Sequence, residues 1–350
     1  MQEVSLQNFK RDIDSIREYI NHINLINRVE ANNRNPQEES LREFSKHLHS
    51  FGTDKKLFEY KAIIMSLYGI LEKYISDWIK EHIDTIPNLI PSYDKLPEEI
   101  TKNHFDLSID LISLIKKEYD KYVHLRKEDV LTRLSSCINT PTNYKLNSDS
   151  FIPKSGNLKH SKVVEAFSLL NIKDLSTKLK NNNNISGILK EQYGDNIANT
   201  KDELLFQIIN DLVTRRNEIA HGVNIDEILG VTEFDDYIDF LEKYGQAIFE
   251  TLVEKEVEYE ALFLFKSIER VIDVFSNKIL CFEIENSNIK VGDYIIVKNS
   301  KNYFTKKEVL EIQKDNKKFN ELNITEKTNI GVNLGGGIKD NQTFYIKINS

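Results

Sequence analysis

The sequence has little cysteine, and its histidines are not arranged as metal ligands. Its 350 residues include two cysteines, Cys137 and Cys281, which lie far apart with no His or Cys neighbour at ligand spacing. This excludes a disulfide framework and a zinc site as the basis of the fold. His47, His104 and His124 also lack carboxylate or cysteine partners at such spacing, so we expect no metal ion.

Long apolar runs are missing as well. No segment approaches the ~18 apolar residues of a membrane span, and the start, MQEVSLQNFK, lacks the apolar core of a secretion signal. We therefore expect no membrane partner and a cytoplasmic location. An apolar content of 40% with 10% aromatics is typical of a folded protein, and the length allows two domains.

The nucleotide-binding loop Gly-x4-Gly-Lys-Ser/Thr is absent, so the chain is not a GTPase, and we expect no cofactor. The glycine-rich segment GGGIKD at 335–340 favours a turn, with a phosphate-cradling loop as the alternative. A net charge of −8 argues against a broad nucleic-acid surface, because phosphate binding depends on Lys and Arg. Residues 266–350 are nevertheless basic, with 14 Lys and Arg against 11 Asp and Glu. Any RNA contact must therefore be local.

Helical periodicity covers the chain as far as residue 267. Apolar residues at spacings of three and four predict helices over 4–30, 55–83, 105–125, 162–170, 203–222 and 233–267. Between them, 31–39, the prolines Pro87, Pro91 and Pro97, the segment 139–158 and the run 181–184 read as linkers and loops.

The strongest helical signal is a seam in residues 55–83. Its members are Tyr60, Ile64, Leu67, Leu71, Tyr74 and Trp78. Packing inside a helical bundle explains this seam, and a dimer seam is the alternative. The flanking Glu72 and Asp77 are expected to be solvated.

The pattern changes near Ile268. Six short β-branched segments follow, separated by Asn, Gly, Asp and Lys turns: VIDVF, ILCFEIE, YIIVKN, VLEIQ, IGVNL and FYIKI. They favour a small closed β-barrel, because closure removes exposed edges. We predict a mainly α protein with a helical domain over 1–267 and a β-barrel domain over 268–350.

Residues 203–222, ELLFQIINDLVTRRNEIAHG, combine an apolar stripe with a charge. Arg216 follows Leu212 by one turn and falls on the packing face, where a guanidinium needs an anionic partner, an aqueous cleft or a ligand phosphate. At 100° per residue, His221 lies about 40° from Asn217 and about 140° from Arg216. The long arginine can reach round, so Arg216, Asn217 and His221 could converge on one phosphate.

The segment RNEIAHG resembles the Arg-x4-6-His signature of HEPN domains, helical proteins widespread as ribonuclease toxins and in anti-phage defence. Arg17 to His22, Arg42 to His47 and Arg215 to His221 also fit the spacing. Arg216 is favoured because a polar Asn follows it, a small residue precedes the His, a Gly stops the helix and an apolar helix leads in.

The resemblance implies an endoribonuclease that needs no metal. His221 would act as general base or acid, Arg216 would grip the phosphate and stabilise its growing charge, and Asn217 would orient the phosphate or the ring. The expected products are a 2′,3′-cyclic phosphate and a 5′-hydroxyl. One chain offers one such His, so we expect a homodimer with the two 203–222 segments apposed, as HEPN ribonucleases commonly form.

Two further features bear on the substrate and on control. Residues 269–348 resemble the second-domain barrel of translation elongation factors, which implies tRNA or a translation-related RNA as substrate. A toxin would also have an inhibitor or antitoxin protein as partner. Toxins silenced by a nucleotidyltransferase carry a Tyr two residues after the His, but Val223 stands here, so that control is not supported.

Other interpretations stay open. The chain could be a non-catalytic module that binds RNA or protein. Arg216 could form a structural ion pair with an acid of the 55–83 helix, and His221 with Gly222 could simply end a helix with a left-handed cap. Arg215 is expected to point to the other side, toward solvent or an RNA backbone.

Overall fold

The computed structural model describes the chain except for residues 33–38, 118–121, 155, 224, 226 and 349–350. The chain divides into two compact units. The first comprises Met1–Ile83, Glu98–His124 and Asn147–Thr251, and the second comprises Asp84–Pro97, Leu125–Leu146 and Leu252–Ser350. The predicted domains 1–267 and 268–350 stay a prediction, although the change from helix to strand does fall between Phe263 and Phe265.

The first unit is helical. Its α-helices are α1 (Glu3–Asn32), most of α2 (Glu39–Leu89), α3 (Glu98–Lys116), α5 (His160–Ser168), α6 (Leu175–Asn181), α7 (Asn183–Tyr193), α8 (Asp202–Leu205), α9 (Gln207–Ala220) and most of α10 (Val231–Phe263). No helix in the described residues combines the length and the apolar character that crossing a membrane requires.

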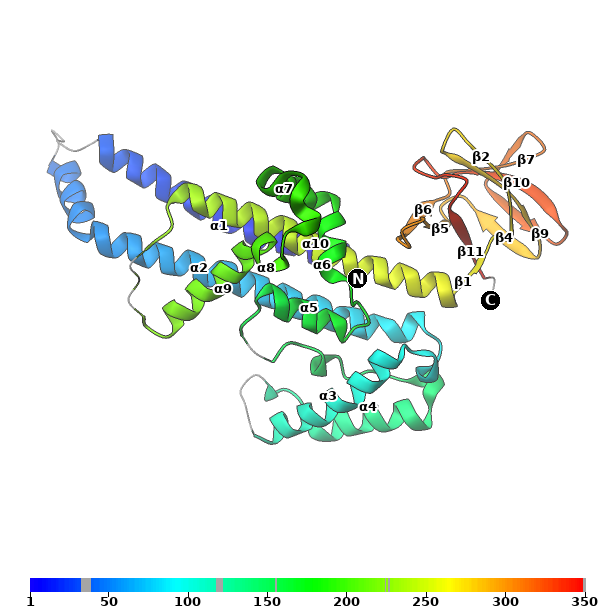
Figure 1. Ribbon diagram of the computed structural model, residues 1–350, viewed down its shortest axis with the longest axis horizontal. Helices are drawn as coiled ribbons and strands as arrows, with labels where there is room; N and C mark the ends of the chain where they lie inside the picture. The colour runs from blue at the N-terminus through cyan, green and yellow to red at the C-terminus, as the bar shows by residue number, and fades with distance from the viewer. Residues whose placement is uncertain (33–38, 118–121, 155, 224, 226, 349–350) are drawn as a thin grey trace. The chain divides into compact units, whose positions relative to one another are not determined.

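The core of this unit forms where α1, α2 and α10 run side by side (Figure 1). The Phe9 ring lies edge-on to Trp78, with 5.2 Å between centroids, and Trp78 lies edge-on to Phe249 at 5.4 Å. Gly245 makes this approach possible, because a Cβ there would stand 2.3 Å from the Phe9 ring. The predicted seam of residues 60–78 is buried among these contacts, which confirms that it packs inside the bundle.

Several helix boundaries differ from the predictions. Helix α2 includes Pro87, which was assigned to a linker, and α3 begins seven residues before the predicted start at Phe105. The other end of that prediction lies partly outside the described residues, as does the predicted break at 31–39. The predicted loop at 181–184 is wrong: Asn182 caps α7 by accepting the Asn184 N–H at 2.8 Å. Glu250 of α10 binds both asparagine amides, so a tertiary contact stabilises the start of α7.

The second unit contains α4 (Lys127–Asn139), the last turns of α10, and antiparallel strands. These are β1 (Phe265–Ser267), β2 (Arg270–Phe275), β3 (Ile279–Ile284), β4 (Ser287–Lys290), β5 (Tyr294–Lys298), β6 (Phe304–Glu308), β7 (Glu311–Lys314), β8 (Lys317–Phe319), β9 (Glu321–Ile324), β10 (Thr328–Asn333) and β11 (Thr343–Lys347). Helix α4 was missed by the sequence analysis.

The strands form sheets in the orders β1-β11-β5-β6, β2-β3-β10-β7-β8 and β4-β9. Their inward residues share one apolar core, which includes Phe282 of β3, Val332 of β10 and Phe344 of β11. Val257 and Ala261 of α10 pack on Ile296 and Phe304 of β5 and β6. The protein is therefore mainly α with a C-terminal antiparallel β region, as predicted, while the likeness to a translation-factor barrel stays a prediction.

The glycine-rich segment at 335–340 forms a turn. Gly335, Gly336 and Gly337 all have positive φ, at 76°, 133° and 75°, a backbone that glycine adopts without strain. The Gly335 N–H is bound by Asn333 Oδ1 and the Ile338 N–H by the carbonyl of Asn277. These amides serve the turn itself, which supports the simpler of the two interpretations.

Candidate functional site

The predicted helix 203–222 is two helices, α8 and α9, which are separated at Phe206. This residue is fully buried with φ −108° and ψ 27°, and its ring stacks on His160 at 3.8 Å. Tertiary packing of the aromatic ring thus accompanies a break that the apolar periodicity did not reveal. From the break, α9 buries Ile209, Leu212 and Val213 and carries the proposed site at its other end.

His221 and Gly222 end α9 with a Schellman cap. Gly222 has φ 67°, its N–H binds the carbonyl of Ile219, and the Val223 N–H binds the carbonyl of Glu218. This pattern satisfies the last carbonyls of the helix. The backbone therefore confirms the interpretation of His-Gly as a helix cap. The His221 side chain is exposed, so its ring is accessible to a ligand.

Arg216 is half-buried, and its contacts are unusual for an arginine. The guanidinium lies over the Tyr68 ring, 4.6 Å from the centroid, and Nη1 donates to Asn217 Oδ1 at 3.0 Å. Nε is buried with no hydrogen-bond partner among the described residues. No carboxylate oxygen in the described part of the chain lies within 4.0 Å of an Arg216 nitrogen. Arg216 therefore forms no ion pair with a described residue, which contradicts that alternative.

Glu72 of α2 lies near the Arg216 guanidinium, with Gly156 of the segment before α5 beside both side chains. A Cβ built on Gly156 would stand 3.1 Å from Arg216 Nη2 and 3.6 Å from Glu72 Oε1. Glu72 is half-buried, which corrects the expectation that it is solvated, whereas Asp77 is exposed as expected. Tyr68, Glu72 and Gly156 were not recognised as site residues from the sequence, because their approach depends on long-range packing.

Both charges act on Tyr68. Burial raises the pKa of the Tyr68 phenol, the negative charge of Glu72 raises it further, and the Leu158 N–H and the positive charge of Arg216 oppose this. A carboxylate and a guanidinium therefore lie close enough to influence one side chain, although they do not bind each other. Arg216 thus keeps, for an anion, the guanidinium donors other than the buried Nε and the one given to Asn217.

The structure brings Arg216 and Asn217 into contact but does not join the His221 ring to them. Within the described part of the chain, His221 and Asn217 are linked through the backbone, where the His221 N–H donates to the Asn217 carbonyl at 3.0 Å. Because Asn217 Oδ1 is occupied by Arg216, Asn217 orients the guanidinium. Its predicted role toward the ring or the phosphate stays a prediction.

Arg215 is not a solvent or RNA contact, and this corrects the expectation. Its Nε binds Asp211 Oδ2 at 2.5 Å, and its Nη1 donates to the Tyr60 hydroxyl at 3.1 Å and to the Glu227 carbonyl at 3.2 Å. Tyr237 donates to the same Asp211 oxygen. Arg215 thus joins α9 to α2 and to the segment that follows α9.

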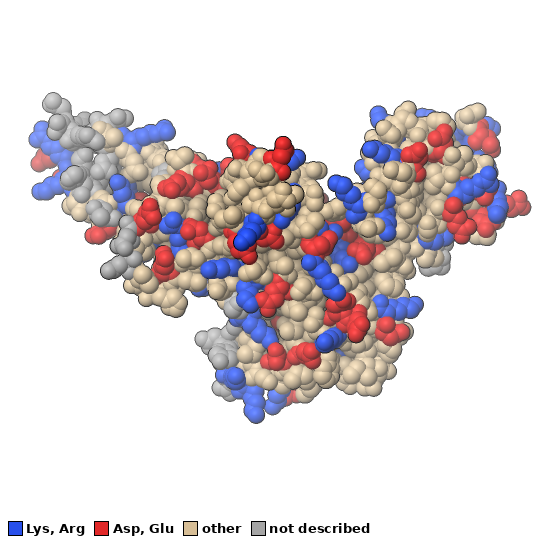
Figure 2. All heavy atoms as spheres, in the orientation of Figure 1, with Lys and Arg blue, Asp and Glu red and all other residues tan. Residues whose placement is uncertain are grey.

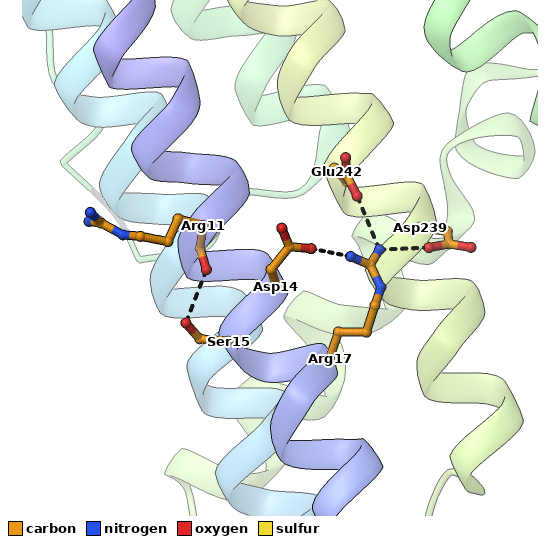
Figure 3. Close-up of polar contacts among 6 residues, drawn as sticks. All are labelled: Arg11, Asp14, Ser15, Arg17, Asp239 and Glu242. Atoms are coloured by element: carbon orange, nitrogen blue, oxygen red, sulfur yellow. Dashed lines mark hydrogen bonds and ion pairs between the residues drawn. The ribbon is translucent and has the colours of Figure 1, made fainter.

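Arg17, the first arginine of another Arg-x4-His match, is also engaged (Figure 3). It binds Asp14 of its own helix, Asp239 at 2.8 Å and Glu242 at 3.0 Å. Its donors hold α1 to α10 and are not available to a phosphate. No group of three His, Cys, Asp or Glu residues in the described chain is placed to hold a metal ion.

Comparison with known proteins identifies a family for the helical region. The model of the family described as RiboL-PSP-HEPN matches residues 7–254, which include α9 and Arg216, Asn217 and His221. No curated protein matches the chain. The matched region ends before the first strand at Phe265.

Proposed function

The chain belongs to the RiboL-PSP-HEPN family, and from this membership and the Arg216 site we propose that it is a metal-independent endoribonuclease. One observation carries the proposal beyond the family. The Arg216 guanidinium is oriented by Asn217 and Tyr68 but has no carboxylate within ion-pair distance among the described residues. An arginine in that state is suited to bind a phosphate with two parallel donors.

The proposed reaction uses the RNA's own 2′-hydroxyl as nucleophile. Arg216 stabilises the charge that develops on the phosphate oxygens, and exposed His221 exchanges protons with the substrate. The products are a 2′,3′-cyclic phosphate and a 5′-hydroxyl. We further propose a homodimer with the α9 helices apposed, since each chain contributes one such histidine. Light scattering that finds only monomer at high protein concentration would contradict the dimer.

The proposed substrate is RNA, and the protein is proposed to contact it through a local surface. On the face shown in Figure 2, Lys and Arg side chains are interspersed with Asp and Glu, so that face has no broad basic surface. We propose that the β region, with its excess of basic residues, helps to hold tRNA or a translation-related RNA. A role as a toxin or anti-phage effector, with an inhibitor protein and a cytoplasmic location, completes the proposal.

Cleavage of total RNA in EDTA tests this function against a non-catalytic RNA- or protein-binding module. The wild type should cut, and His221→Ala should not. His22→Ala is the matched control, because His22 is an exposed histidine that ends another Arg-x4-His match. Binding of RNA by the wild type with no cleavage under any condition would favour the module instead.

A further inference from the structure

We propose that one turn of the β region binds the phosphate backbone of single-stranded RNA. The turn is the glycine segment 335–337 between β10 and β11, and three lysines lie beside it: Lys278, Lys307 and Lys339. This basic turn lies outside the residues that the family model matches, and it shares no residue with the Arg216 site. As a contact for substrate it rests on the proposed ribonuclease function, whereas its binding of RNA can be tested without cleavage.

The fold brings two of these lysines to the turn from other strands. Lys307 belongs to β6, and its Nζ lies 3.3 Å from the point where a Cβ of Gly337 would stand. Lys278 ends the hairpin turn between β2 and β3, and its Cγ lies 3.7 Å from the corresponding point of Gly336. The backbone fixes this hairpin against the turn, because the Lys278 carbonyl accepts the Leu334 N–H at 2.8 Å. Three separate parts of the β region thus meet here.

The protein does not neutralise these ammonium groups. No carboxylate oxygen in the described residues lies within 4.0 Å of any of the three. This holds even for Lys307 and Lys339, which an acidic residue follows directly in sequence. Lysines elsewhere in the β region do have such partners: Lys306 with Glu260, Lys318 with Glu311 and Lys327 with Glu283. The basic turn therefore keeps its positive charge for an anion outside the protein.

Backbone N–H groups add donors to this charge. Gly335 and Ile338 give their N–H groups to asparagine oxygens, and these bonds hold the turn. The N–H groups of Gly336 and Gly337 have no acceptor among the described residues. Two of the four amides thus serve the turn and two do not. Phosphate oxygens accept hydrogen bonds from lysines and from backbone N–H groups alike, so both kinds of donor fit the same ligand.

An exposed aromatic ring favours RNA over a free anion. Phe275 begins the hairpin turn that Lys278 ends, and the Lys278 N–H donates to the Phe275 carbonyl at 2.9 Å. Phe275 is 52% exposed at the end of β2, which is an edge strand of its sheet. Bases of single-stranded RNA stack on aromatic rings while their phosphates bind nearby lysines. Phe275 and the basic turn together provide both contacts, and neither depends on the base sequence.

The test measures how tightly the full chain binds a labelled oligouridine whose 2′-hydroxyl groups are methylated. A methylated 2′-oxygen cannot attack the phosphate, so the probe reports binding whether or not the protein cuts RNA. The test variant combines Lys278→Gln, Lys307→Gln and Lys339→Gln. The control variant removes the same charge from paired lysines of the same region: Lys306→Gln, Lys318→Gln and Lys327→Gln.

The test variant should bind the probe about 10- to 100-fold more weakly near about 0.1 M salt, because three contacts to phosphate are lost. The slope of log affinity against log salt concentration should become less negative by about 2. The control variant should stay within about threefold of the wild type, since salt screens charges that do not touch the RNA.

A second pair of variants tests the aromatic contact. Phe275→Ala should bind the probe about fivefold more weakly, because a base loses its stacking partner. Ile272→Ala removes another exposed apolar side chain from β2, where Ile272 is 48% exposed, and should bind as the wild type does.

The inference is wrong if the test variant binds as tightly as the wild type, if its salt slope is unchanged, or if the control variant loses as much affinity. Titration with inorganic phosphate at constant ionic strength adds an independent check. Binding of phosphate that the test variant loses, with its RNA affinity unchanged, would make the turn a site for a free anion instead. If the variants bind as expected but the wild type leaves RNA intact, the ribonuclease proposal fails while the RNA contact stands.

Discussion

Arg215 and Arg216 are neighbours in sequence, and the molecule uses them in opposite ways. Arg215 is bound on three sides, by Asp211, by the Tyr60 hydroxyl and by the Glu227 carbonyl. Arg216 rests on the face of Tyr68 and donates one hydrogen bond, to Asn217, while its buried Nε has no partner in the described residues. The contacts of Arg215 stabilise the fold, whereas the contacts of Arg216 leave its guanidinium able to bind an anion.

The two histidines near α9 show the same contrast. His160 is 3% exposed, stacks on Phe206, and makes ring contacts with Tyr244 at 3.0 Å and Ser176 at 2.9 Å. His221 is exposed at the helix end, where only its backbone is engaged in the cap. Polar side chains whose hydrogen bonds are made within the protein, such as His160, serve the fold. Side chains that keep donors or acceptors for a ligand, such as His221, belong to the candidate site.

The largest expected effect separates the two arginines by activity. Arg216→Ala should lower the cleavage rate by about 10²- to 10³-fold, because the charge on the phosphate in the transition state loses its partner. Arg215→Ala should leave the rate of the folded protein near that of the wild type. Single-turnover rates below the melting temperature measure both, and equal losses would remove the distinction between them.

For the free energy of unfolding, the order of the two variants should be the opposite of their order for activity. Arg215→Ala should lower the free energy of unfolding by roughly 2–3 kcal/mol, because the hydrogen bonds of a charged guanidinium are lost and, of the described residues, Tyr237 alone still binds Asp211. Arg216→Ala should lower it by about 1 kcal/mol, because it loses the cation–π contact with Tyr68 and one hydrogen bond but no ion pair. Urea unfolding followed by circular dichroism measures this. A larger loss in Arg216→Ala would make Arg216 a structural residue.

The buried histidine should give stability a pH dependence. Burial lowers the pKa of His160 from 6.5 to about 4, so between those values the unfolded chain binds a proton that the folded chain does not. The contribution of neutral His160 to the free energy of unfolding is therefore fully present above pH 6.5. It falls as the pH drops, by about 2 kcal/mol between pH 7 and pH 5. His104, whose pKa burial also lowers to about 4, adds a similar loss.

A variant isolates the part due to His160. His160→Gln should reduce the difference in unfolding free energy between pH 7 and pH 5 by about 2 kcal/mol, whatever its stability at neutral pH. His22→Ala, at an exposed histidine, should keep the wild-type difference. An identical slope in His160→Gln and wild type would show that His160 does not stay neutral in the fold.

The smallest expected effect concerns the ring beneath Arg216. Tyr68→Leu should slow cleavage about fivefold, because the cation–π contact contributes on the order of 1 kcal/mol. Tyr68→Phe keeps the ring and should stay within about twofold of the wild type. Rates of the folded variants at low temperature test this. Equal rates for Tyr68→Leu and wild type would mean that the ring does not hold Arg216 in its working position.

Periodicity predicted much of this molecule because burial repeats along an element. The seam from Tyr60 to Trp78 and the packing face of α9 follow from apolar residues on one side of a helix. The change to β structure near Ile268 follows from β-branched residues between turns. In each case the signal and the structure involve residues within a few positions of one another.

What the sequence could not provide was the surroundings of Arg216. Tyr68 and Glu72 lie on another helix and Gly156 in a connecting segment, so no local pattern joins them to α9. The same limit applies to the start of α7, where Glu250 of α10 binds the asparagines that resembled a loop. Arg215 was misjudged because its partners Tyr60 and Glu227 are distant or follow the helix end.

The chemistry of the cut ends tests the central claim most directly. Purified wild-type protein is incubated with RNA in EDTA, beside Arg216→Ala and Arg215→Ala, and the new ends are identified by enzymatic ligation and mass spectrometry. We predict 5′-hydroxyl and 2′,3′-cyclic phosphate ends from the wild type and Arg215→Ala, and none from Arg216→Ala. Ends carrying a 5′-phosphate, or cleavage that persists in Arg216→Ala, would contradict the proposed role of this site.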